Sequence, residues 1–239
     1  MLIAAVSDLD SLGGDFREFA RAVDSAKKPD LLLFAGDICD INKARQYKEI
    51  LAILDKAGWD CPIFGVFGNR EIEEEFDTIR RITAGRVTWL EDEMVAKKIK
   101  GKTVEIIGTR GCLDRPTWWQ ATNFPGIDNM YKDRFDRIVE MIRYPSKADL
   151  KILVSHYGLS YKTLKGENPE IYAGLGCSAL EPVIAKSKLK FAVHGHAHFG
   201  TAQALAGRVP IFNVAFPVNK GIVLIDTDKM PKKGLNKFL

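Results

Sequence analysis

Three short apolar runs in the first seventy residues constrain the fold most, because each stays apolar throughout instead of alternating with polar residues. They span Leu2–Val6, Leu31–Phe34 and Pro62–Phe67. A continuous apolar run is typical of a strand covered on both faces. Segments with helical spacing of apolar residues follow each run, and this repetition favours a parallel sheet with crossover helices. Helices are expected over 16–26, 43–57 and 71–84.

The rest of the chain has a different pattern. A hairpin is expected at 94–107 and a helix at 131–142, and strand-like runs occur at 151–155, 191–193, 209–214 and 221–225. The segments 110–126 and 158–178 have no regular spacing and are expected to be long irregular loops, which in compact domains are usually functional. We therefore expect one mixed α/β domain over 1–239, with parallel strands first and antiparallel ones later.

Charge and composition exclude several classes of protein. The 239 residues contain no apolar stretch of the ~18 residues that a spanning helix needs. The N-terminus lacks the basic region of a signal peptide, and the cysteines form no C-x-x-C pair, so a reducing, cytoplasmic location without membrane attachment is expected. The net charge of +4 is not gathered into long basic blocks, which argues against nucleic acid as a partner.

Acidic and amide residues follow all three apolar runs. Asp8 and Asp10 come after the first run, Asp37 after the second and Asn69 after the third. Asp and Asn are common at turns and helix starts, so one such site would be unremarkable on its own. Three in succession at the carboxyl ends of parallel strands, where open sheets bind ligands, predict a shared site.

The positions of the histidines indicate that this shared site binds metal. All four of them lie in two groups: His156 directly follows one apolar run, and His194, His196 and His198 follow another. Carboxylates, an amide oxygen and imidazoles without a thiolate suit Mn, Fe, Zn, Co or Ni. The number of candidate ligands is too large for one ion, so two ions that share a ligand are expected.

The motif order D-x-D, G-D, G-N-R-E, H and G-H-x-H resembles the calcineurin-like metallophosphoesterases, whose usual signature has D-x-H and G-N-H-E or G-N-H-D. The motifs run from Asp8 to His198. The resemblance implies a four-layer α-β-β-α sandwich of two mixed sheets flanked by helices, the metallo-dependent phosphatase fold. It also implies that one divalent ion is held by Asp8, Asp10, Asp37 and His198, and the other by Asp37, Asn69, His156 and His196.

The same resemblance implies a mechanism. The two ions clamp phosphate oxygens, and a hydroxide that bridges them attacks phosphorus in line. Asp37 bridges both ions in this assignment. His194 is expected to lie outside the ligand set and to support it, since the family ligands are the two histidines of G-H-x-H.

Position 10 is the first departure from the family pattern. Asp10 stands where the family usually has His, and it is still expected to be a ligand because a carboxylate binds divalent metals. A third carboxylate makes the cluster more nearly neutral, which weakens its attraction for a phosphate dianion. It also favours harder ions, so manganese is the preferred prediction, ahead of iron, zinc, nickel or cobalt.

Position 70 is the second departure. Arg70 stands where the family has a His that resembles a general acid, and an arginine side chain stays protonated and cannot do that work. Arg70 can hold a phosphate oxygen and restore the positive charge that Asp10 removes. The alternative is a structural salt bridge, for example to Glu71 or Glu73.

The loop 110–126 is expected to select the substrate. Trp118 and Trp119 can stack on a base or sugar, and Arg115 can contact phosphate. The alternative is that the two tryptophans close a small core beneath a long loop.

These patterns favour a dinuclear metal-dependent phosphoesterase, with diesters preferred over monoesters because Arg70 cannot protonate a poor leaving group. The expected substrate is a small phosphate ester, including one that contains a nucleotide. The alternatives are a non-catalytic metal- or phosphate-binding scaffold or sensor on the same fold and, third, a nuclease. Oligomeric state, substrate identity and the leaving group's proton donor are left open.

Overall fold

The three apolar runs form neighbouring parallel strands, β1 (Leu2–Val6), β2 (Leu31–Ala35) and β3 (Ile63–Val66), in a computed structural model that describes residues 1–230. Every residue of β2 is buried, and its side chains alternate between two cores. Leu32 and Phe34 pack under helices, whereas Leu31, Leu33 and Ala35 face the second sheet. This confirms the prediction of strands covered on both faces.

Two mixed sheets are formed within residues 1–230. The first has the order β11-β1-β2-β3-β4, in which only the pairing of β11 with β1 is antiparallel. The second has the order β5-β6-β7-β8-β10-β9, with a parallel centre and an antiparallel strand at each edge. The further strands are β4 (Val87–Trp89), β5 (Glu93–Ile99), β6 (Lys102–Thr109), β7 (Leu150–Ser155), β8 (Phe191–His194), β9 (Gln203–Ala206), β10 (Val209–Asn213) and β11 (Val223–Asp226).

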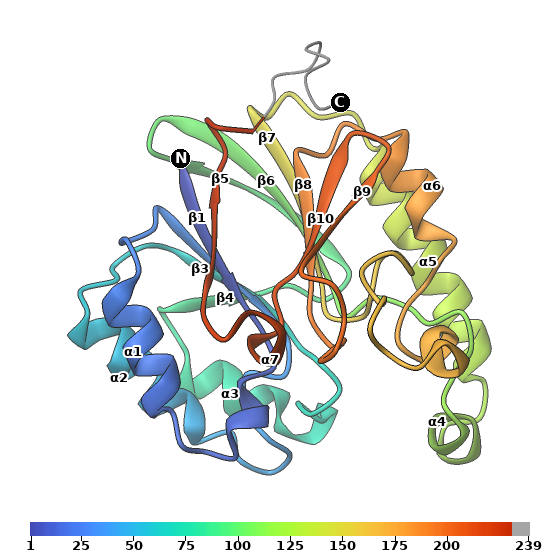
Figure 1. Cartoon of the computed structure of the whole chain (residues 1–239), viewed down its shortest axis with the longest axis horizontal. Helices are drawn as coiled ribbons and strands as arrows, with labels where there is room; N and C mark the ends of the chain where they lie inside the picture. Colours follow the sequence, from blue (N-terminus) through green and yellow to red (C-terminus); the bar gives the residue numbers. More distant parts are fainter. Residues whose placement is uncertain (231–239) are drawn as a thin grey trace.

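Helices cover the outer face of each sheet. Figure 1 shows α1 and α2 on one side of the molecule and α5 and α6 on the other, with the sheets between them. The expected α-β-β-α layering is therefore confirmed. The helices are α1 (Arg17–Ser25), α2 (Gln46–Lys56), α3 (Phe76–Ile82), α4 (Trp118–Asn123), α5 (Ile127–Arg143), α6 (Leu180–Ala185) and α7 (Phe216–Asn219).

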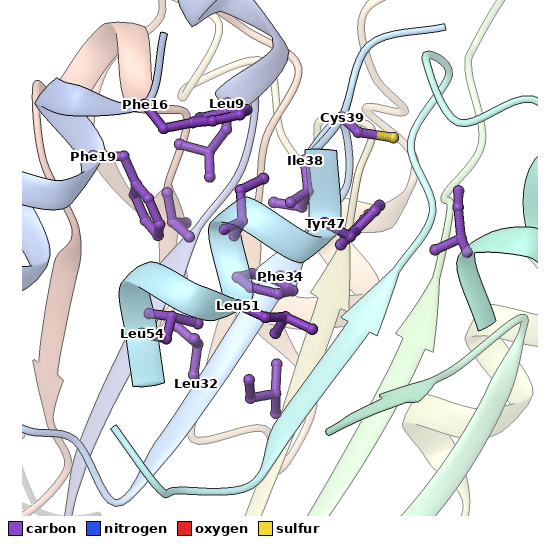
Figure 2. Close-up of a cluster of buried hydrophobic side chains, with 14 of the residues drawn as sticks. Leu9, Phe16, Phe19, Leu32, Phe34, Ile38, Cys39, Tyr47, Leu51 and Leu54 are labelled. Atoms are coloured by element: carbon purple, nitrogen blue, oxygen red, sulfur yellow. The ribbon is translucent and has the colours of Figure 1, made fainter. Parts of the chain in front are cut away.

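One apolar cluster fixes α1 and α2 against the first sheet (Figure 2). Phe19 of α1 and Leu54 of α2 pack with Leu32 and Phe34 of β2, and all four side chains are almost fully buried. Burial of a side chain of this size stabilises the fold by about 1.5–3 kcal/mol. The cluster extends to Tyr47 near the end of β2, so the core reaches the region where the predicted site residues gather.

The structure differs from the sequence expectations at short elements. The segment 110–126 is not irregular throughout, because α4 lies inside it with a capping box between Thr117 and Gln120. The helix expected over 71–84 is shorter: α3 is preceded by the 3-10 turn Glu73–Glu75. Other 3-10 turns are Leu9–Leu12 and Pro169–Gly174, the latter inside the long segment 158–178.

Among the described residues, no helix has both the length and the hydropathy needed to cross a bilayer. All four cysteines lie in this part of the chain and are free thiols, as their spacing predicted. Residues 231–239 of the expected domain lie outside the described residues.

Candidate metal centre

The predicted ligand residues lie in the loops that follow strands of both sheets. β1 leads from the N-terminus toward α7, and the backbone of Ser7 bridges to Ala215 just before that helix (Figure 1). Because parallel strands end at the same edge of a sheet, side chains far apart in sequence meet there. The loops after β1, β2, β3, β7 and β8 contribute, respectively, Asp8 and Asp10, Asp37, Asn69, His156, and the pair His196 and His198.

Two groups of potential ligand atoms share Asp37. One atom each from Asp8, Asp10 and Asp37 lie within 4.8 Å of one another. The same holds for one atom each from Asp37, His156 and His196. Each group contains three of the four residues that the resemblance assigned to one ion.

The remaining two predicted ligands lie beside these groups. Asn69 Oδ1 is 2.8 Å from His156 Nε2, and His198 Nε2 is 3.0 Å from Asp8 Oδ1. All seven predicted ligand residues are therefore brought together at one edge of the two sheets.

The backbone is strained at three of these residues. Asp8, Asp37 and His196 have φ values of 58°, 52° and 69°, in the left-handed region that L residues rarely adopt. Such conformations cost about 1–3 kcal/mol each and persist only where surrounding contacts impose them. They turn the chain sharply after β1, after β2 and within the G-H-x-H motif.

Two motif glycines permit the close packing behind these residues. A Cβ on Gly68 would lie 2.5 Å from Asp37 N, and one on Gly195 would lie 2.5 Å from Asp8 Oδ2. Both distances are far below van der Waals contact, so a side chain at either position would displace a predicted ligand. The glycines of G-N-R-E and G-H-x-H are thus required by packing against the carboxylates.

Glu71 holds the Asp37 loop in its strained conformation, a function that the sequence reasoning missed. Its buried carboxylate accepts backbone N–H groups from Asp37 at 2.8 Å, Ile38 at 2.7 Å and Gly68 at 2.7 Å. It also accepts the Tyr47 hydroxyl at 2.9 Å. The available signal was its place as the last residue of G-N-R-E. Because its carboxylate is fully engaged, Glu71 fixes the loops after β2 and β3 relative to each other.

His194 is fully buried at the end of β8, directly before the G-H-x-H motif. Burial lowers the pKa of His194 to about 4, so the ring is neutral. Its Nδ1 is 2.7 Å from the carbonyl of Gly195, which can only accept, so Nδ1 carries the proton. Nε2 lies 2.7 Å from the Thr163 hydroxyl oxygen, which also lies 2.9 Å from the Ser160 carbonyl. His194 therefore fastens the G-H-x-H turn to the loop 158–178.

His156 is oriented as metal ligands usually are, and His196 is neutral. His156 Nδ1 faces the Ala35 carbonyl at 3.0 Å, which leaves Nε2 directed at Asn69 and Asp37. Burial lowers the pKa of His196 to about 3, so its ring is neutral and able to ligate. For His156, burial acts in the same direction, but the carboxylates of Asp37 and Asp8 outweigh it and raise its pKa to about 9.

The carboxylate group carries a surplus of negative charge. Burial, followed by repulsion from Asp37 and Asp8, raises the pKa of Asp10 to about 7. The buried Asp10 Oδ1 has no hydrogen-bond partner within residues 1–230. A buried oxygen without a donor costs free energy, and a divalent cation between these carboxylates would satisfy it. The residues therefore fit a metal.

Arg70 pairs with carboxylates other than those considered from the sequence. Its Nη2 is 2.5 Å from Asp40 Oδ1 and its Nε is 3.4 Å from Asp10 Oδ2, whereas Glu71 is engaged with backbone amides. Arg70 and Asp10, the two departures from the family signature, are thus in direct contact. Forty per cent of the Arg70 side chain remains exposed.

The tryptophans of the loop 110–126 do not close a core. Trp118 is 80% exposed and Trp119 is 58% exposed, so the core-closing alternative is wrong. Arg115 is also exposed, and its backbone N–H donates to the Ala173 carbonyl. The structure does not bring these three residues into the ligand groups.

The loop is nevertheless connected to the ligands through α4. Gln120 Nε2 lies 3.3 Å from the Tyr157 hydroxyl, and the Tyr157 ring packs against the His196 ring with centroids 4.9 Å apart. Gln120, which shares this short helix with the two tryptophans, therefore contacts a side chain that touches a predicted ligand.

Comparisons with known proteins agree with this fold. The chain is similar in structure to phosphopantetheinyl hydrolase from Mycobacterium tuberculosis, with a TM-score of 0.65 and 16% identity over 89% of this chain and 88% of that one. It is also similar to the protein TT1561 of Thermus thermophilus (TM-score 0.56, 15% identity, 95% and 98% covered). For a 5'-nucleotidase precursor from Thermus thermophilus, the TM-score is 0.50 and the identity 14%, over 96% of this chain but only 52% of the nucleotidase.

These likenesses concern the fold, because the identities are low. No curated protein matches the chain by sequence. The sequence model of the calcineurin-like phosphoesterases, however, matches residues 1–200, which is most of the chain and contains every predicted ligand. The chain belongs to the calcineurin-like phosphoesterase family.

Proposed function

We propose that this protein is a dinuclear metal-dependent phosphoesterase that hydrolyses phosphodiesters in preference to monoesters. One ion would be held by Asp8, Asp10, Asp37 and His198. The other would be held by Asp37, Asn69, His156 and His196. Manganese is the proposed metal, because three carboxylates in one ligand set suit a hard ion.

The observation that carries this proposal is the shared position of Asp37. Two groups of donor atoms meet at its carboxylate, and one of them includes Asp10, whose buried Oδ1 has no hydrogen-bond partner within residues 1–230. Arg70 and the nearby histidines offset the mutual repulsion of the three carboxylates only in part, because the pKa of Asp10 stays raised, and bound cations would offset the rest. Two bound divalent ions would supply Lewis-acid activation of water and of the phosphate oxygens.

The chain's own residues support the binding and orientation of a phosphate. The guanidinium of Arg70 lies at the edge of the carboxylate group, exposed on one side, where it can hold a phosphate oxygen. It cannot protonate a leaving group. A diester whose alcohol leaves as a stable anion needs little proton transfer to the leaving group. Arg70 therefore favours such substrates over simple alkyl monoesters.

Substrate selection is proposed for the exposed aromatic face of α4. Trp118 and Trp119 offer stacking area for a base or another aromatic leaving group, and Arg115 precedes them in the same loop. The link from Gln120 through Tyr157 to His196 supports a position near the bound substrate. The proposed substrates are small phosphate esters with an aromatic or nucleoside group.

Parallel turnover assays test the proposal. Metal-stripped protein is reloaded with Mn(II), Ni(II) or Zn(II) and incubated with bis-p-nitrophenyl phosphate and with p-nitrophenyl phosphate. Asp37→Ala, which removes the shared ligand, is the blank, and Asp60→Ala, an exposed residue outside these motifs, is the matched control. We expect diester cleavage to exceed monoester cleavage and to disappear only in Asp37→Ala, with two metal ions bound per native chain.

Other results would redirect the proposal. Equal or faster monoester cleavage would contradict the diester preference and require a proton donor other than Arg70. Two bound ions without turnover of either ester would favour a phosphate-binding scaffold or sensor, the interpretation that Arg70 in place of a general acid supports.

A further inference from the structure

Asp40 is the shortest contact of Arg70, and no sequence motif drew attention to it. The Arg70 guanidinium lies between two carboxylates, with Nη2 2.5 Å from Asp40 Oδ1 and Nε 3.4 Å from Asp10 Oδ2. We propose that Asp40 is a positioning residue that fixes the Arg70 guanidinium beside Asp10 so that it can bind the phosphoryl group of the substrate. This inference rests on the proposed function.

The contact with Asp10 does not orient Arg70 by itself. The buried Arg70 Nε has no hydrogen-bond partner within residues 1–230, so the Asp10 pair is an ionic contact without hydrogen-bond geometry. The Asp40 contact is a hydrogen-bonded ion pair, which is shorter and directional. The direction of the guanidinium is therefore set by Asp40.

Asp40 is itself held in place by its own loop. Its Oδ1 accepts the backbone N–H of Ile41 at 2.8 Å, and its Oδ2 accepts Lys43 Nζ at 2.8 Å. Its backbone N–H donates to Gln46 Oε1 at 3.0 Å, and Gln46 is the first residue of α2. The Asp40 backbone is thus tied to the first residue of α2, and its carboxylate is held by the loop that precedes this helix.

This arrangement leaves part of the guanidinium free. Arg70 Nη1 makes no hydrogen bond within the described residues, and 40% of the side chain is exposed. A free arginine loses much of its rotamer entropy when it binds a phosphate. Because Asp40 restricts Arg70 in the folded protein, that loss is reduced when the substrate binds.

If Asp40 acted only as a negative charge, its removal would strengthen phosphate binding, which is the opposite of what a positioning residue predicts. Neutralising a carboxylate near an anion site strengthens anion binding, because a repulsive charge disappears. Loss of positioning weakens it. The sign of the change in phosphate affinity therefore separates a positioning residue from an ordinary surface charge.

A double-mutant cycle tests the proposal on Mn(II)-loaded protein. Native protein, Asp40→Asn, Arg70→Ala and the double variant are titrated with inorganic phosphate by calorimetry, and KM and kcat for bis-p-nitrophenyl phosphate are measured in parallel. We expect Asp40→Asn to weaken phosphate binding and raise KM about fivefold, with a smaller change in kcat. In the Arg70→Ala background, Asp40→Asn should change neither value.

Two further variants complete the test. Glu73→Gln neutralises a carboxylate that lies near Arg110 and does not pair with Arg70, and it should leave phosphate binding unchanged or slightly tighter. Asp40→Glu keeps the charge but displaces it by one methylene, and it should give an intermediate loss. If Asp40→Asn lowers the thermal midpoint of the protein, the phosphate affinity of Asp40→Glu is used instead to decide the proposal.

Three results would overturn the proposal: unchanged or tighter phosphate binding in Asp40→Asn, an equal loss in the Arg70→Ala background, or full retention of affinity in Asp40→Glu. The phosphate titration needs no turnover. It therefore decides the part played by Asp40 even if native protein hydrolyses neither ester, a result that would count against the proposed function alone.

Discussion

Replacement of Glu71 by glutamine is a direct test of how the strained loops at the metal centre are held. The Glu71 carboxylate accepts N–H groups at both oxygens: Asp37 and Gly68 at Oε2, and Ile38 and Cys39 at Oε1. Glutamine has the same shape, but one oxygen becomes an NH₂ group. Whichever way the amide is turned, two buried backbone N–H groups then face a donor and lose their acceptor.

The magnitude follows from the number of lost acceptors. A buried donor left without a partner costs about 1–3 kcal/mol, so two cost about 2–6 kcal/mol. Burial and the nearby Asp37 carboxylate raise the pKa of Glu71, which means that its charge is itself costly to bury. A neutral amide recovers part of that cost. We therefore expect the free energy of unfolding to fall by about 3 kcal/mol, a large part of a typical total of about 5–15 kcal/mol.

Urea unfolding of metal-free protein at pH 7 measures this change without interference from bound ions. Glu74→Gln is the matched control, because Glu74 is exposed in the neighbouring 3-10 turn and accepts no backbone N–H group there. The control should stay within about 0.5 kcal/mol of native protein. A Glu71→Gln loss below about 1 kcal/mol would refute the reasoning, since it would show that the N–H groups find other acceptors. Weaker Mn(II) binding by the variant should accompany the loss, because Glu71 fixes Asp37.

Four other outcomes are expected. Adding Mn(II) at about 100 times its Kd to chelator-stripped protein should stabilise it by about 2.7 kcal/mol for each ion bound and raise the thermal midpoint by about 5–10 °C per ion in calorimetry, whereas no shift would contradict metal binding. Gly68→Ala should abolish Mn(II) binding in dialysis measurements, while Gly221→Ala, whose Cβ would meet no atom closer than 3.8 Å, should bind normally. Although burial raises the pKa of Asp114, hydrogen bonds from Ser178 lower it overall, so its stabilising effect is present above its unfolded pKa and disappears as the pH falls. Asp114→Asn should therefore cost about 1 kcal/mol at pH 7 and progressively less below about pH 4 in urea unfolding, and an equal loss at both pH values would contradict this. Trp118→Ala should leave stability within about 0.5 kcal/mol of native, because 80% of the side chain is exposed, and should raise KM only for aryl esters.

The central strands could be predicted closely from the sequence, because a strand that is buried on both faces consists of consecutive apolar residues. The run Leu2–Val6 coincides with β1, and Leu31–Phe34 lies within β2, since a strand covered on both faces is apolar at every position. The short elements escaped prediction. Six residues in α4 and four in β9 are too few to establish a period, and their ends are set by a capping box and by pairing with β10.

The ligand residues could also be predicted, for a related reason. A parallel sheet brings the carboxyl ends of its strands together, so the residue type after each strand is enough to place Asp8, Asp37 and Asn69 at one edge. The histidines of G-H-x-H follow the same rule in the second sheet. Local sequence therefore determined which side chains reach the site.

Tertiary structure alone decided how those side chains are held and paired. Glu71 reaches Asp37 across 34 positions of sequence, and Arg70 reaches Asp40 across 30, so neither contact has a local pattern. The salt-bridge alternative for Arg70 named Glu71 and Glu73 as examples because they are close in sequence, whereas in the structure Arg70 pairs with Asp40 and Asp10. Periodicity and spacing report on burial and strand ends, but the geometry between loops depends on how two sheets and their helices pack together.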